Sequence, residues 1–119
     1  MNGSSRSACP PGGDDAASWV FRGMTCTRRR QYNEAVVAFE RALHLNATMV
    51  EAMVGMGNAF FALERYDDAL QAYDRALAVA PERPALHLAR SNALEALGRC
   101  NEAHQAYDCA LALRCRSHQ

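Results

Sequence analysis

One segment of this sequence occurs three times at a constant spacing. Tyr32–Leu43 returns as Tyr66–Leu77 and, with more substitutions, as Cys100–Leu111. A fixed period of this length is typical of chains built from stacked units, in which each unit buries a face against the next. Such a chain is better suited to holding a partner than to catalysing a reaction, so we expect a binding protein and not an enzyme.

The apolar residues recur at the spacing of an α-helix. Met53, Met56 and Phe60 lie three or four residues apart, which places one apolar stripe along a helix. Pro81 ends one helix because it has no N–H to donate, and Pro84 suits the first turn of the next. We predict an all-α protein with helices over residues 16–29, 33–45, 50–63, 67–79, 84–97 and 101–113.

Length and composition fit one domain with a short tail. At 119 residues the chain forms at most one domain. Residues 1–15 are rich in Gly, Ser and Pro and are expected to form a disordered tail. The remainder divides into three repeats, 16–49, 50–83 and 84–117. The net charge of zero argues against a nucleic-acid partner.

The cysteines and the hydropathy pattern indicate a cytoplasmic protein. None of the five cysteines has C-x-x-C spacing, and the first twenty residues contain no apolar core of a signal peptide. No apolar stretch approaches the length that a membrane span needs. We therefore expect free thiols in a reducing compartment and no membrane partner.

Small and aromatic residues recur in phase at the predicted helix contacts. In the middle repeat, Gly57 and Ala69 would let two helices cross closely, and Tyr73 would fill the space beside them as one of the most buried side chains. The same three places hold Gly23, Ala35 and Phe39 in the first repeat and Ser91, Ala103 and Tyr107 in the third.

This pattern resembles the tetratricopeptide repeat family over residues 16–117. The resemblance implies an α-solenoid of three antiparallel helix pairs, wound into a right-handed superhelix with a concave, ligand-holding face. It also implies a protein–protein interaction adaptor or scaffold.

The concave face implied by the resemblance is lined mainly by apolar residues. We select eight candidate ligand-groove residues: Val20, Phe21, Met24, Val54, Asn58, Phe61, Leu88 and Asn92. Contiguous apolar surface usually marks an interaction site, so we expect a short apolar segment of a partner protein as the ligand. Asn58 and Asn92 either hold the backbone of an extended peptide or are ordinary residues of a helix surface.

Some members of the family bind the acidic C-terminal tails of cytosolic heat-shock chaperones through a clamp of Lys, Arg and Asn side chains. The resemblance places the five clamp positions at Val20, Met24, Gly55, Ala85 and Ala89, and none of them holds the clamp residue. We therefore expect no chaperone-tail adaptor of that kind.

No motif for catalysis, a cofactor or a metal stands out. Gly55–Asn58 lacks the third glycine of a dinucleotide-binding loop and lies inside a predicted helix. Cys100, His104 and Cys109 lack a regular zinc-ligand spacing. All 13 basic residues are Arg, which excludes a lysine nucleophile. Arg28–Arg30 either complements the dipole at the end of the first helix or contacts an acidic partner.

Two predicted contact surfaces are unusual. Arg90 stands where a residue normally packs on the preceding repeat, so its guanidinium must reach water or an acid, and His87 has the same problem. We expect the interface between the second and third repeats to be weak. No polar capping helix follows the third repeat, so Tyr107, Ala110 and Leu111 should be partly exposed and support a weak homodimer. Alternative functions are a self-associating structural module and the interaction part of a larger enzyme or complex.

Overall fold

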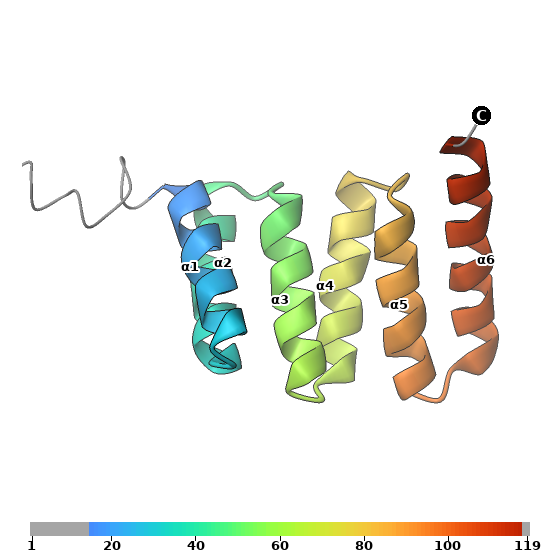
Figure 1. Cartoon of the computed structure of the whole chain (residues 1–119), viewed down its shortest axis with the longest axis horizontal. Coiled ribbons are helices and arrows are strands. Elements are labelled where there is room, and N and C mark those ends of the chain that lie inside the picture. The colour runs from blue at the N-terminus through green and yellow to red at the C-terminus, as the bar shows by residue number, and fades with distance from the viewer. Residues whose placement is uncertain (1–14, 118–119) are drawn as a thin grey trace, which may run out of the picture.

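The structure is a computed structural model that describes residues 15–117. It contains six α-helices: α1 (Ala16–Arg28), α2 (Tyr32–Leu45), α3 (Val50–Ala62), α4 (Tyr66–Val79), α5 (Pro84–Ala96) and α6 (Cys100–Ser117). The helices stand side by side in chain order, and each packs mainly on its neighbours in the sequence (Figure 1). No strand occurs within residues 15–117. The predicted all-α stack of three antiparallel helix pairs is confirmed.

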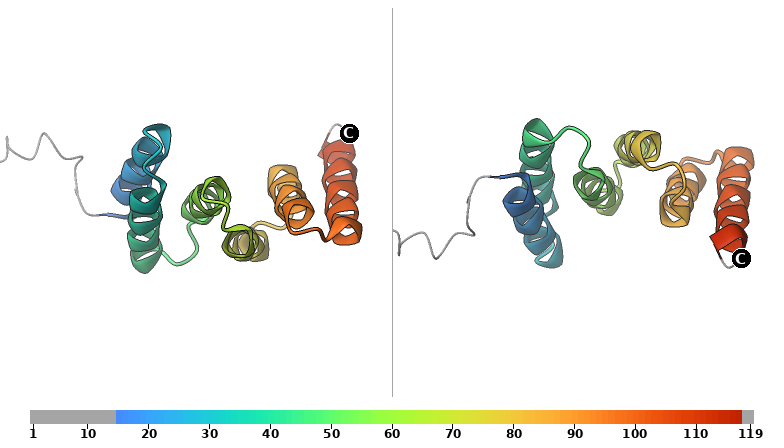
Figure 2. Two further views of the ribbon diagram at one scale, coloured as in Figure 1. Left: turned by 90° about the horizontal axis from the view of Figure 1, so that it is seen from below. Right: turned by 90° about the horizontal axis from the view of Figure 1, so that it is seen from above.

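Successive helices step to alternate sides of the stack, as α3, α4 and α5 show most clearly (Figure 2). In the first half of the stack, α1 packs on α3 as well as on α2. Within residues 15–117, no helix is both long enough and apolar enough to cross a membrane.

The helix bounds agree with the predicted ranges to within one residue, except at the end of α6. That helix continues to Ser117, beyond the predicted end at position 113. No Gly or Pro interrupts this last turn, and Arg114 and Arg116 carry positive charge where the helix dipole favours it.

Asp15 caps α1, because its Oδ1 accepts a hydrogen bond of 2.9 Å from the backbone N–H of Ser18. The rest of the expected tail lies outside the described residues.

The two helices of each pair are joined by the same short turn. Its middle residue has a positive φ in each case: 63° at Arg30, 63° at Glu64 and 80° at Gly98. The following N–H then donates back to a carbonyl of the preceding helix, as Arg65 does to Phe60 at 2.8 Å. This left-handed ending suits glycine, which only the third turn has.

Close helix crossings explain the small residues that recur in the sequence. Tyr73 is 2% exposed, and its ring lies so near Gly57 that a Cβ there would be 2.6 Å from Cε1 of Tyr73. Ala69 on α4 is fully buried. Both the close crossing and the deep burial of Tyr73 are as predicted, since any larger residue at Gly57 would push the aromatic ring away.

The contact between the second and third helix pairs accommodates two polar residues. Nε of Arg90 on α5 donates to Oδ1 of Asp74 on α4 at 2.6 Å, so the guanidinium reaches an acid as predicted. Nε2 of His87 lies 3.0 Å from the carbonyl oxygen of Pro81. The side chains of Arg90 and Asp74 are 28% and 50% exposed, so this ion pair contributes at most about 1 kcal/mol.

The outer surface of α6 is partly as predicted. Tyr107 and Leu111 are 48% and 41% exposed. The prediction for Ala110 is wrong, because its side chain is fully buried. Ala110 shares a helix face with the buried Ala103 and Ala106, so it belongs to the inner side of α6 and not to its outer surface.

Candidate ligand groove

A hollow of about 210 Å³ lies between α3 and α5. Its lining comes from α3 (Asn58, Phe61, Ala62), from α4 (Tyr73) and from α5 (Ala89, Asn92). Three residues selected from the sequence, Asn58, Phe61 and Asn92, therefore lie around one hollow. The two alanines leave the space open, because their side chains end at Cβ.

The other five selected residues lie outside the lining of this hollow. Phe21 and Met24 on α1 are 60% and 55% exposed, and Val54 and Leu88 are half-buried. Val20 belongs to the hydrophobic core and is only 8% exposed, so it offers a ligand almost no surface. The exposed apolar surface on α1 and the hollow beyond it are thus two separate features.

The amide of Asn58 has a defined orientation. Oη of Tyr73 donates to Oδ1 of Asn58 at 2.6 Å. The hydroxyl is protonated and acts as the donor at neutral pH, and burial raises the pKa of Tyr73 further, from 10.0 to about 12. Because the amide oxygen is engaged, the NH₂ group of Asn58 is the part available to donate to a carbonyl of a ligand.

Phe61 forms an apolar wall of the hollow and is itself held in place. Its ring meets that of Tyr66 edge to face, with 5.0 Å between centroids and 73° between planes. Such aromatic pairs prefer this geometry over direct stacking. Phe61 is half-buried, so one side of its ring faces the hollow while the other is packed.

The structure gives a physical reason for the missing chaperone-tail clamp at Gly55. The ring of Phe39 covers this position, and a Cβ on Gly55 would lie 2.6 Å from Cε1 of Phe39. Phe39 is 1% exposed and cannot easily move aside. An asparagine at Gly55 is therefore excluded by packing, whereas the sequence showed only that it was absent.

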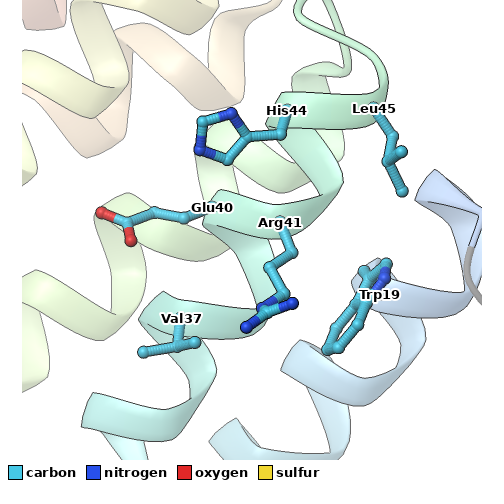
Figure 3. A pocket seen from close by; sticks show the side chains of 6 residues that line it. All are labelled: Trp19, Val37, Glu40, Arg41, His44 and Leu45. Atoms are coloured by element: carbon cyan, nitrogen blue, oxygen red, sulfur yellow. The ribbon is translucent and has the colours of Figure 1, made fainter.

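A second hollow lies at the N-terminal end of the stack and has a volume of about 640 Å³. It is lined by Trp19 on α1 and by residues of α2: Val37, Glu40, Arg41, His44 and Leu45 (Figure 3). The guanidinium groups of Arg22 and Arg41 lie 4.7 and 5.1 Å from the centroid of the Trp19 ring.

Sequence reasoning missed this second hollow. The signal available was the pair of apolar residues Val37 and Leu45, which are 51% and 56% exposed on α2. Both residues lie outside the apolar stripe of α2, on the exposed surface of the helix where polar residues are expected.

Neither hollow contains a metal-ligand set. Among the residues that the structure describes, no three His, Cys, Asp or Glu side chains lie close enough to hold a metal ion. Cys26, Cys100, Cys109 and Cys115 are free thiols. The three residues weighed as zinc ligands, Cys100, His104 and Cys109, are exposed on α6.

Comparison with known proteins identifies the family. The tetratricopeptide repeat model matches residues 27–93, which is more than half of the chain. The chain belongs to the tetratricopeptide repeat family. Domains of this family are generally protein–protein interaction modules. No curated protein sequence matches the chain.

Solved structures share the fold. A crystal structure of MamA has a TM-score of 0.86 and 21% identity, covering 88% of this chain and 61% of the MamA chain, so this chain spans less than two thirds of that protein. The second tetratricopeptide domain of Spaghetti (RPAP3), bound to the HSP90 peptide SRMEEVD, has a TM-score of 0.79 and 21% identity over 82% of this chain and 91% of that domain. A chain of the CopN–Scc3 complex has a TM-score of 0.79 and 17% identity, with coverages of 82% and 58%.

Proposed function

We propose that this protein is an adaptor or scaffold that binds a short, largely apolar segment of a partner protein at the hollow between α3 and α5. The observation that carries the proposal is the meeting of Asn58, Phe61 and Asn92 around one space. Phe61 supplies an apolar wall and the two asparagines supply amide donors, which is the combination that an extended peptide needs. We propose no catalytic activity and no cofactor.

The size and chemistry of the hollow define the ligand. Its volume of about 210 Å³ suits one or two apolar side chains placed between Phe61, Ala62 and Ala89. The NH₂ group of Asn58 then donates to a backbone carbonyl of the peptide. Because ordering a flexible segment is costly, we expect micromolar affinity, about −8 kcal/mol.

An acidic C-terminal tail is not the proposed ligand. The Spaghetti (RPAP3) domain was solved with the peptide SRMEEVD, which carries several carboxylates. The lining of the hollow in this chain contains neither Arg nor Lys, so carboxylates would have no cation to pair with. Phe21 and Met24 are also exposed on α1, apart from the hollow, so this second surface is apolar as well.

A peptide-array screen followed by titration of the hits tests this proposal. Phe61→Ala should weaken binding about tenfold or more, because it removes the apolar wall. Phe61→Leu should retain most of the affinity. The matched control is Val37→Ala, which truncates an apolar side chain that is 51% exposed on α2, outside the hollow. Arg116→Ala should also change little.

Two readings of the titrations are decisive. A loss with Phe61→Ala, at an unchanged helical content by circular dichroism, supports the site. The proposal is wrong if recognition is electrostatic. In that case the hits would be uniformly acidic, would lose affinity in moderate salt, and would bind Phe61→Ala with the same affinity as the unmodified chain.

Self-association is the second candidate function. The exposed Tyr107 and Leu111 favour it, since large apolar side chains on an outermost helix usually mark a contact surface.

We further propose three repeats with the boundaries 16–49, 50–83 and 84–117. We also propose a cytoplasmic location, which the four free thiols among the described residues support. The interaction part of a larger enzyme or complex is the third alternative.

A further inference from the structure

The two ends of the stack expose residues whose equivalents are covered inside it. Tyr107 on α6 is the equivalent of Tyr73 in the next repeat, yet it is 48% exposed whereas Tyr73 is 2% exposed. Leu111 is 41% exposed, while its equivalent Leu77 packs against the core. The difference arises because α5 lies against α4, and no described helix lies against the outer side of α6. We call Tyr107, Asp108 and Leu111 the C-terminal end surface.

The opposite end shows the complementary pattern. Met53 and Met56 on α3 are 3% and 5% exposed, because α2 lies against α3. Their equivalents on α1, one repeat earlier, are Trp19 and Arg22, and Arg22 is exposed. We call Trp19 and Arg22 the N-terminal end surface. The hollow that adjoins Trp19 lies at this end, where the first helix pair has no described neighbour before it.

One ion pair inside the chain shows how the two end surfaces can meet. Asp74 on α4 pairs with Arg90 on α5 at 2.6 Å across the contact between the second and third helix pairs. Asp108 occupies the place in the third repeat that Asp74 occupies in the second. Arg22 occupies the place in the first repeat that Arg90 occupies in the third. The C-terminal end surface therefore carries the acid of this pair, and the N-terminal end surface carries its arginine.

We infer that copies of this chain associate head to tail, with the C-terminal end surface of one copy against the N-terminal end surface of the next. Asp108 pairs with Arg22 of the second copy, as Asp74 pairs with Arg90 within the chain. Tyr107 and Leu111 pack against α1 of that copy. This inference rests on the self-association proposed above and specifies the surface that meets α6.

The side chains around Trp19 suit this contact. Arg22 and Arg41 both lie over the indole ring, at 4.7 and 5.1 Å. Arg22 can therefore turn to a carboxylate of a neighbouring copy while Arg41 keeps its cation–π contact. A contact of α6 with α6 of a second copy would instead bring two copies of Asp108 to the same interface and leave Trp19 uncovered.

A head-to-tail contact joins two different surfaces and therefore is not complete at two copies. A linear assembly keeps one unused C-terminal end surface and one unused N-terminal end surface, so further copies can add at either end, whereas a symmetric contact stops at two copies. The hollow between α3 and α5 belongs to neither end surface, so one copy can bind a peptide and associate with other copies at the same time.

Sedimentation equilibrium of the 119-residue chain at low salt, from about 10 μM to about 1 mM, tests the inference. We expect the weight-average mass to rise with concentration and to pass that of two copies. Asp108→Arg alone and Arg22→Asp alone should each lower the association constant about fivefold or more, because each places like charges together. Arg75→Asp and Glu82→Arg, exposed positions away from both ends, are the matched controls and should leave it unchanged.

Restoring association by reversing both charges is the most specific test. The double variant Asp108→Arg with Arg22→Asp should associate like the unmodified chain. An equimolar mixture of the two single variants should do so as well, because each then meets an opposite charge. Circular dichroism melts show whether all variants are folded, which is expected because the changes are at exposed positions.

Three outcomes would overturn the inference. The first is a single-copy mass at the highest concentration. The second is a plateau at two copies that Arg22→Asp leaves unchanged, which would keep the self-association and exclude its head-to-tail form. The third is a failure of both the double variant and the mixture to restore association. Failure of peptide binding to the hollow would leave all three measurements unaffected and would count only against the adaptor proposal.

Discussion

Replacing Tyr73 by Phe removes one oxygen atom from a buried ring and leaves the rest of the packing intact. The ring is 2% exposed, and Oη donates to Asn58 at 2.6 Å. Asn58 lies at the surface, so its freed oxygen can accept a hydrogen bond from water. The lost hydrogen bond should therefore cost only about 0.5–1.5 kcal/mol of the unfolding free energy at neutral pH. Tyr73→Ala, which also empties the core beside Gly57, should cost about 3–5 kcal/mol.

The pH dependence of the same variant is more diagnostic than its magnitude at neutral pH. Burial disfavours the phenolate and raises the pKa of Tyr73 from 10.0 to about 12. The folded protein holds this proton more tightly than the unfolded chain does, so its contribution to stability is complete below pH 10 and is lost as the pH rises from 10 to 12. A shift of this size corresponds to at most about 2.7 kcal/mol, and we expect about 1–2 kcal/mol because the hydroxyl borders an open hollow that water screens.

Guanidinium-induced unfolding, followed by circular dichroism between about pH 9 and pH 11.5, measures this effect in both proteins. The unmodified chain should be more stable than Tyr73→Phe at the lower pH, and this advantage should shrink and then reverse as the pH rises. Tyr107→Phe, the same change at a ring that is 48% exposed, is the matched control and should alter stability by less than about 0.5 kcal/mol at the lower pH. A stability difference between the unmodified chain and Tyr73→Phe that stays constant across this pH range would refute the assignment of a buried, proton-donating hydroxyl.

Thermal unfolding and hydrogen exchange check three further expectations. Glu64→Gly should stabilise the protein by about 1 kcal/mol, because φ is 63° there, and Gly98→Ala should destabilise it by a similar amount, because φ is 80°. Gly57→Ala should cost about 1–3 kcal/mol, since its Cβ would lie 2.6 Å from Cε1 of Tyr73. Amide hydrogens of α5 and α6 should exchange faster than those of α3 and α4, because α6 packs mainly on α5 alone and the exposed Arg90–Asp74 pair adds little to the contact with α4. Equal protection in all four helices would contradict the last expectation.

The repeat pattern made most of the fold predictable, because in a stack of helices the period records the packing directly. Gly57 and Tyr73 could be assigned to one crossing from their spacing alone. The need of the Arg90 guanidinium to reach water or an acid also followed from its place in the repeat. The burial of Ala110 on α6 was harder to predict. This residue lies between side chains that point inward and side chains that point outward, so a small rotation of the helix decides whether it is buried.

The candidate groove was predictable in its residues and not in its geometry. Asn58 and Asn92 were selected from their place in the repeat, yet the bond between Asn58 and Tyr73 depends on two helices meeting at a given distance. Phe39 likewise covers Gly55 only because α2 and α3 cross closely. Periodicity gives the face of a helix on which a residue lies. It does not give the rotamer or the helix separation, and these determine a hydrogen bond or a blocked position.

The position of the hollow between α3 and α5 ties ligand binding to the assembly of the stack. Its lining comes from the second helix pair and from the first helix of the third, so it spans the boundary that Arg90 and Asp74 also bridge. A ligand in the hollow contacts helices on both sides of this boundary. Its binding free energy therefore adds to the free energy that keeps α5 and α6 docked. The measured affinity is correspondingly scaled by the fraction of chains in which those helices are in place. A substitution that loosens α6, far from any ligand atom, will therefore weaken binding to the extent that it lowers the fraction of unliganded chains in which the last pair is docked.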